Sequence, residues 1–165
     1  MAAAILRWLV SKGANGGEAA WAGDPGHGQL VGLGALSDAE LPRLPGVYLV
    51  RQGAAGPVVY VGMAGERSGQ GLRSRLRRYT DGRVLASGLG EAVFDRALAD
   101  ASWLRERLVE VETGRPKRAT DWGKAALAWA DLHVCWAVTE SGEAADALEK
   151  KVLALETVDW WNRDR

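Results

Sequence analysis

Two short apolar segments of the chain each carry a tyrosine. The first covers residues 46–51 and contains Tyr48, and the second covers residues 57–62 and contains Tyr60. Side chains alternate along a strand, so an antiparallel hairpin of these segments can place both tyrosines on one face. A shared tyrosine face could hold a substrate. The hairpin alone favours a plainer interpretation, in which both are half-buried strand tyrosines with solvated hydroxyls, because tyrosine is common in strands.

An arginine-rich helix is predicted directly after the hairpin, over residues 70–80. Leu72, Leu76 and Tyr79 form one stripe of this helix, and Arg75 falls at the edge of that stripe. We therefore expect the Arg75 guanidinium beside the sheet, where its planar fork suits a phosphate group. The alternative is an arginine that buries only its stem and keeps its charge in solvent.

The charges of the chain are segregated, although its formal net charge is zero. The segment from Arg67 to Arg78 holds five arginines and no acidic residue, and a second basic run covers residues 115–118. A polyanion responds to the local field, so a neutral protein can still present a phosphate-binding surface. The same residues could equally form a solvated face. The candidate nucleic-acid contacts are Arg67, Arg73, Arg77, Arg78, Lys117 and Arg118.

A helix predicted over residues 143–156 carries two glutamates on the flank of its apolar stripe. These are Glu149 and Glu156, and their spacing does not distinguish them. One carboxylate is too little for a tight metal site made by protein alone. It is enough for Mg²⁺, which keeps several waters and takes phosphate oxygens as ligands.

Taken in order, these residues resemble the GIY-YIG nuclease family. The triplet at 46–48 (GVY) is similar to the first family triplet, and the triplet at 60–62 (YVG) is similar to the second. Arg75 on the following helix, Glu149 on a helix after the third strand and Asn162 beyond it complete the pattern. The resemblance covers residues 46–79 and 132–162, and its order selects Glu149 because Glu156 is too near Asn162.

The resemblance implies that the protein is a metal-dependent endonuclease that hydrolyses phosphodiester bonds. DNA is the expected substrate, and RNA is the alternative. It implies that Glu149 binds one Mg²⁺ or Mn²⁺ and that Arg75 holds the scissile phosphate. It also implies that Asn162 braces the site by hydrogen bonding.

The resemblance gives the tyrosines a role as well. Tyr60 would position or deprotonate the attacking water, with Tyr48 assisting, and nearby cations and the metal are expected to lower the tyrosine pKa. The position four residues after the arginine is histidine in many restriction and homing members. It is Tyr79 here, as in the excinuclease C group.

The predicted fold is a single α+β domain over residues 1–165, with a GIY-YIG-like three-stranded antiparallel sheet flanked by helices. Residues 83–130 form a helical insert before the third strand, and residues 1–42 wrap the core, beginning with a helix at 2–12. Residues 13–35 are rich in glycine and lack periodicity, which predicts irregular structure. The predicted strands are 46–51, 57–62 and 132–139.

Composition limits the other properties of the protein. The single cysteine, Cys135, cannot form an internal disulfide, which fits a reducing compartment, and the predicted location is the cytoplasm. No apolar run approaches the length of a membrane span. DNA is the predicted partner, and a homo-oligomer or a partner protein would supply specificity. The alternative function is a non-catalytic nucleic-acid-binding or protein-assembly module on the same fold.

Overall fold

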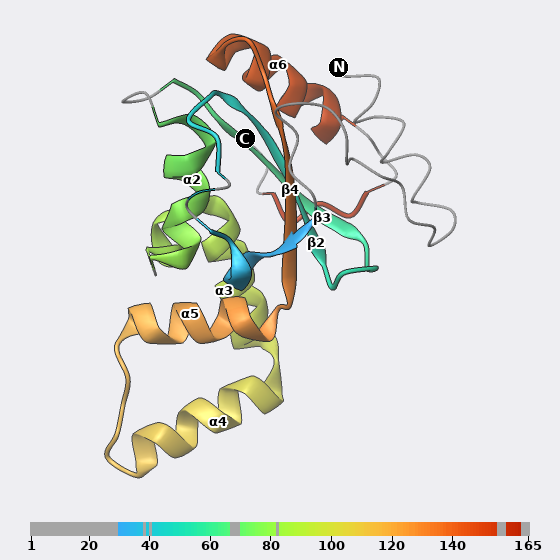
Figure 1. Cartoon of the computed structure of the whole chain (residues 1–165). Coiled ribbons are helices and arrows are strands. Elements are labelled where there is room, and N and C mark those ends of the chain that lie inside the picture. Colours follow the sequence, from blue (N-terminus) through green and yellow to red (C-terminus); the bar gives the residue numbers. More distant parts are fainter. Residues whose placement is uncertain are drawn as a thin grey trace.

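The computed structural model describes residues 30–37, 39, 41–66, 70–81, 83–154 and 158–162. They form an α+β fold around an antiparallel sheet (Figure 1). The sheet contains β1 (Val31–Gly32), β2 (Gly46–Gln52), β3 (Val58–Ala64) and β4 (Leu132–Val138), in the order β1-β4-β2-β3. The predicted helix at 2–12 lies outside the residues that the structure describes.

The three long strands agree with the sequence prediction, but the sheet has a fourth strand. Residues 31–32, predicted to be irregular, pair with β4, with Val31 opposite Val134 and Gly32 opposite His133. A two-residue strand shows no alternation, so its pattern could not be seen in the sequence. A short 3₁₀ helix, η1 (Leu33–Ala35), follows it directly. The predicted three-stranded sheet is therefore corrected to four strands.

Alternation along the strands divides the core into two layers. Tyr48, Val50 and Tyr60 project into one buried cluster. Val47, Leu49 and Val61 project into another, on the opposite face of the sheet. The prediction that both tyrosines share one face is confirmed.

The helices pack on the two faces of this sheet (Figure 1). On the tyrosine face lies α2 (Gly71–Thr80), which buries Leu72, Leu76 and Tyr79. On the opposite face lies α6 (Gly142–Leu153), which buries Ala145, Leu148 and Val152. The remaining helices are η3 (Val84–Ala86), α3 (Gly88–Ala99), α4 (Ala101–Glu112) and α5 (Ala119–Trp129).

The predicted helical insert before the third long strand is present. Helices α3 and α5 pack against each other, with η3 beside both, while α4 lies on the far side of α5 from the sheet (Figure 1). Two of the helices begin at a side-chain cap, since Ser87 accepts a hydrogen bond from Gly90 N and Asp100 accepts one from Trp103 N. Across the described ranges, no helix has the length and apolarity that crossing a membrane requires.

Candidate active site

Three tyrosines and one arginine meet on the face of the sheet that α2 covers. Tyr48 on β2 and Tyr79 on α2 join their hydroxyls in a hydrogen bond of 2.9 Å. Tyr60 on β3 stacks on Tyr48, with ring centroids 6.2 Å apart. Tyr48, Tyr60 and Tyr79 are exposed by only 0%, 3% and 4%. The alternative of half-buried tyrosines with solvated hydroxyls is therefore wrong.

Glycines in both sequence triplets make this arrangement possible. Tyr48 lies opposite Gly62 in the β2–β3 pairing. A Cβ on Gly62 would overlap the phenol ring and hydroxyl of Tyr48. A Cβ on Gly46 would overlap the carbonyl oxygen of Ala137 and lie 2.7 Å from the Cδ1 of Leu72. Each triplet therefore combines a tyrosine with the glycine that the surrounding packing demands.

Arg75 reaches the tyrosines from α2, as its place on the helical wheel predicted. Its Nε donates a hydrogen bond of 3.3 Å to the hydroxyl of Tyr48. The side chain is half-buried, and within the described part of the chain it makes no ion pair with a carboxylate. A cation without an acidic partner, partly withdrawn from water, stabilises an anion that comes to it.

Burial determines the protonation of this cluster. The pKa of Tyr48 is raised well above its usual value, first by burial and then by Tyr79, and the nearby Arg75 offsets this only in part. Burial also raises the pKa of Tyr79. Arg75 lowers the pKa of both tyrosines, as expected of a neighbouring cation, but burial outweighs it. Both remain protonated near neutral pH, so neither can act as a general base there.

The first residues of α3 pack against the tyrosines, a contact that was not predicted from the sequence. Ser87, the N-cap of α3, lies beside Tyr79 and is buried. A Cβ on the next residue, Gly88, would lie 3.0 Å from the hydroxyl of Tyr60. The signal available in the sequence was a serine followed by two glycines within four residues, which is also common in turns.

Asn162 lies against the outer edge of β3. Its Oδ1 accepts a hydrogen bond of 3.1 Å from Val61 N, and its Nδ2 donates one of 2.8 Å to Val61 O. Trp161 N donates a further bond of 2.7 Å to Val59 O. The C-terminal segment thus pairs with the edge strand beside Gly62. The bracing contacts predicted for Asn162 are made to the backbone of β3.

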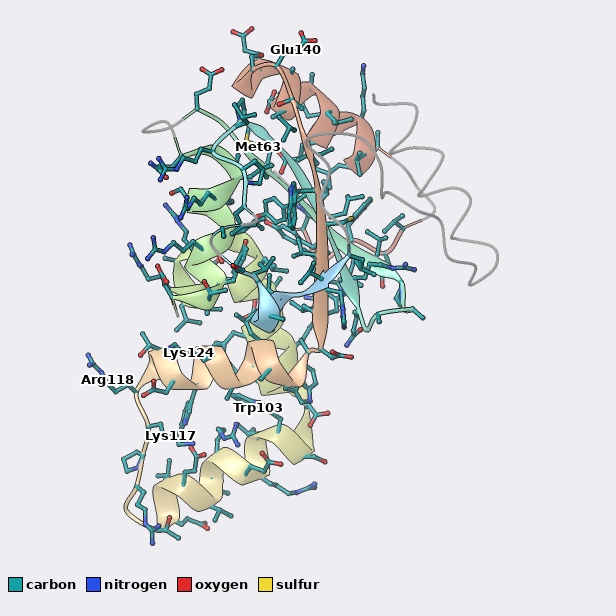
Figure 2. The ribbon with its side chains drawn as sticks, viewed as in Figure 1. Met63, Trp103, Lys117, Arg118, Lys124 and Glu140 are labelled. Carbon is teal, nitrogen blue, oxygen red and sulfur yellow. The ribbon has the colours of Figure 1, made fainter. Side chains whose placement is uncertain are left out.

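Glu149 lies on α6, on the face of the sheet opposite to Arg75. It is 8% exposed and belongs to the buried stripe of α6 with Ala145, Leu148 and Val152. Both α2 and α6 pack on β2 and β3, so the two side chains approach the same pair of strands from opposite faces. Met63, on the edge strand β3, is seen between α2 and α6 (Figure 2).

Glu149 is the carboxylate that the resemblance assigns to a metal ion. No group of three or more His, Cys, Asp or Glu side chains that could hold a metal occurs among the residues described here. A single buried carboxylate fits Mg²⁺ or Mn²⁺ only when water and phosphate oxygens supply the other ligands. Close approach of Gly142 to Gly65, with the Gly142 Cβ position 3.3 Å from the Gly65 Cα, brings the start of α6 against the end of β3.

The predicted nucleic-acid contacts come from two elements. Arg73, Arg77 and Arg78 lie on α2, where the Arg77 Nε forms an ion pair of 3.1 Å with Asp81. Lys117 and Arg118 lie on the connection between α4 and α5 (Figure 2), and Lys117 pairs with Glu110 at 3.0 Å. The remaining candidate, Arg67, lies outside the residues that the structure describes.

Comparison with protein-family models, with curated proteins and with solved structures finds no match to this chain. Its function must be argued from the chemistry of the residues assembled around β3.

Proposed function

We propose that this protein is a metal-dependent endonuclease that hydrolyses phosphodiester bonds, first of all in DNA, on a GIY-YIG-like fold. The observation that carries the proposal is Arg75. It is a half-buried cation whose recorded hydrogen-bond partner is the hydroxyl of Tyr48, with no carboxylate paired to it in the described ranges. A phosphate oxygen is the anion that best fits a planar guanidinium held beside hydroxyl groups.

Each residue of the proposed site has a separate task. Arg75 binds the scissile phosphate and offsets the charge that develops on it in the transition state. Tyr48 and Tyr79, both protonated, orient Arg75 through the bonds of 3.3 Å and 2.9 Å. Tyr60 orients the attacking water, and Asn162 keeps the edge of β3 in place.

Glu149 would hold Mg²⁺ or Mn²⁺, which when bound stabilises the leaving oxygen. The bond cleaved would then lie across the edge of β3, with Arg75 on one side and Glu149 on the other. This arrangement is the geometric content of the proposal.

Cleavage of supercoiled plasmid tests the proposal. Wild-type protein is incubated with plasmid and Mg²⁺ or Mn²⁺, beside a sample with chelator and beside Glu149→Gln. We expect nicked and linear products with the wild type only when metal is present, and a loss of at least about a hundred-fold with Glu149→Gln. A wild type that cuts neither DNA nor RNA contradicts the proposal, as does a Glu149→Gln variant that cuts equally well.

One observation favours a second candidate, a nucleic-acid-binding module without catalysis. Arg75 and Glu149 approach from opposite faces of the sheet, so the phosphate-binding group does not need the carboxylate in order to bind. Fluorescence anisotropy with a labelled duplex distinguishes the candidates. Binding that depends on Arg75 without any cleavage supports the module, and binding accompanied by metal-dependent cleavage supports the nuclease.

A further inference from the structure

Helix α4 presents several apolar side chains to solvent, while two of its charged side chains face the protein. The outward residues Leu104, Leu108 and Val111 are 45%, 53% and 46% exposed. The inward side chains of Arg107 and Glu110 are only 11% and 20% exposed. A surface helix of a soluble domain normally shows the reverse arrangement, so the outer face of α4 is suited to being covered.

The inward contacts fix the orientation of this helix. Trp103 packs edge-on against Phe94 of α3, with ring centroids 6.1 Å apart, and Arg107 stacks on Trp103 at 4.8 Å. Glu110 accepts a hydrogen bond of 3.0 Å from Trp122 Nε1 and pairs with Lys117. Trp103 and Lys117 occupy the space between α4 and α5 (Figure 2). Helix α4 therefore cannot rotate its apolar side inward without breaking this network.

The exposed residues follow the spacing of a helix-packing seam. Ala101, Leu104, Leu108 and Val111 are separated by three, four and three residues, which places them on one stripe. Val109 is 56% exposed but lies well off the stripe on the helical wheel. The stripe, defined here as these four residues, is thus a specific surface that a neighbouring helix could cover.

The charges beside the stripe select the partner. Arg105 and Glu112 lie on the same flank, seven residues apart, one near each end of α4. A nucleic acid would require a basic flank, and this flank is neutral. In an antiparallel pair of α4 helices, a two-fold axis level with residues 108 and 109 brings Arg105 of each copy to the height of Glu112 of the other. In a parallel pair, Arg105 and Glu112 of the two copies would lie on opposite sides of the seam and could not pair.

We propose that the stripe is a self-association surface, on which two copies of this chain pack their α4 helices antiparallel across a two-fold axis. The interface is isologous, since the same patch serves both copies, and the two Arg105–Glu112 pairs set its register. A helix of this length is about 18 Å long, so the interface is small and the dimer dissociates in the micromolar range. The inference does not depend on the proposed nuclease activity.

Sedimentation velocity of the full chain tests this dimer, at concentrations from about 1 µM to about 300 µM. The wild type is expected to shift from monomer to dimer. Leu108→Glu is expected to weaken association at least about a hundred-fold, because a charge replaces the centre of the seam. Val109→Glu is the matched control, an exposed apolar residue of the same helix off the stripe, and is expected to dimerise normally. Circular dichroism confirms that both variants fold.

Charge reversal tests the register. Arg105→Glu and Glu112→Arg are each expected to weaken dimerisation roughly ten-fold, and the double variant is expected to recover most of the loss. A wild type that remains monomeric over the whole range overturns the proposal, even if the stripe captures another protein. A dimer that survives Leu108→Glu, or a double variant as weak as the single ones, overturns it as well.

Discussion

The phenol ring of Tyr48 lies across Gly62, the residue that it faces on the neighbouring strand. The position that a side chain of residue 62 would occupy is filled by the ring and hydroxyl of Tyr48. This relationship holds the hydroxyl of Tyr48 where Arg75 and Tyr79 reach it. A glycine in one strand thus determines where a tyrosine of the next strand can put its polar end.

Gly62→Ala is expected to destabilise the protein by about 1–3 kcal/mol, because the added methyl group must displace a fully buried ring. The free energy of unfolding in urea measures this cost. Gly34→Ala is the control, since a Cβ on Gly34 meets no atom within 4 Å. Equal stabilities of the two variants would contradict the packing of Tyr48 over Gly62.

The Tyr48–Tyr79 hydrogen bond is expected to couple the two residues energetically. Tyr48→Phe and Tyr79→Phe should each cost about 1–2 kcal/mol, because a buried hydroxyl loses its partner. The double variant should cost less than the sum, by at least about 0.5 kcal/mol. A double-mutant cycle of urea unfolding measures this coupling, and strictly additive losses would show that the hydroxyls do not interact.

Stability is expected to fall in alkaline solution. The folded state holds the protons of Tyr48 and Tyr79 at a pH where the unfolded chain, with tyrosine pKa near 10.0, has begun to lose them. Unfolding then releases protons. Below that pH, the contribution of these tyrosines to the free energy of unfolding is fully present and does not change with pH. It decreases above it, by up to about 1.4 kcal/mol per pH unit for each group.

The thiol of Cys135 also lowers the free energy of unfolding in alkaline solution, and its effect begins at a lower pH than that of the tyrosines. Burial raises the pKa of its thiol from 9.0 to about 12, so its contribution begins to be lost as the pH rises past 9.0. Urea unfolding at a series of pH values measures the slope. Cys135→Ala should flatten the curve from 9.0 up to about 12, and between 9.0 and 10.0 the thiol is the main contributor to the slope. An unchanged curve in that interval would contradict the assignment to Cys135.

Much of the candidate site followed from local rules of periodicity. The alternation of the hairpin placed Tyr48 and Tyr60 together, and the helical wheel selected Arg75 from its neighbours. These predictions succeeded because the period of a strand or helix decides which side chains share a face. Helix ends were predicted less well, as α6 begins at Gly142 and ends at Leu153 rather than at 143 and 156.

The features that sequence could not supply depend on contacts between distant segments. The pairing of Val31 with Val134 requires the sheet to exist first. The raised pKa of Tyr48 depends on complete burial, which a pattern of residue types does not measure. The approach of Arg75 and Glu149 from opposite faces depends on which side of the sheet each helix packs, and the order of residues along the chain does not contain that choice.

Asn162 is expected to protect the edge of β3. Its Oδ1 accepts a hydrogen bond from the Val61 N–H group, and its Nδ2 donates a hydrogen bond to the Val61 carbonyl oxygen. Asn162→Ala should cost about 1–2 kcal/mol and speed hydrogen exchange at the Val61 amide, because that amide then faces water. Exchange measured by NMR would show the change at Val61, while amides of the central strand β2 serve as the internal control. Unchanged protection at Val61 would show that another group covers it.

The cleavage rate of Arg75→Ala tests the central claim most directly. The rate is measured in a single turnover on plasmid with Mg²⁺, beside Arg83→Ala, an exposed arginine just beyond α2 with a side chain that is 75% exposed. We expect Arg75→Ala to be slower than the wild type by about a hundred- to a thousand-fold and to be partly rescued by added guanidinium, while Arg83→Ala cleaves normally. Equal rates for Arg75→Ala and the wild type would contradict the account.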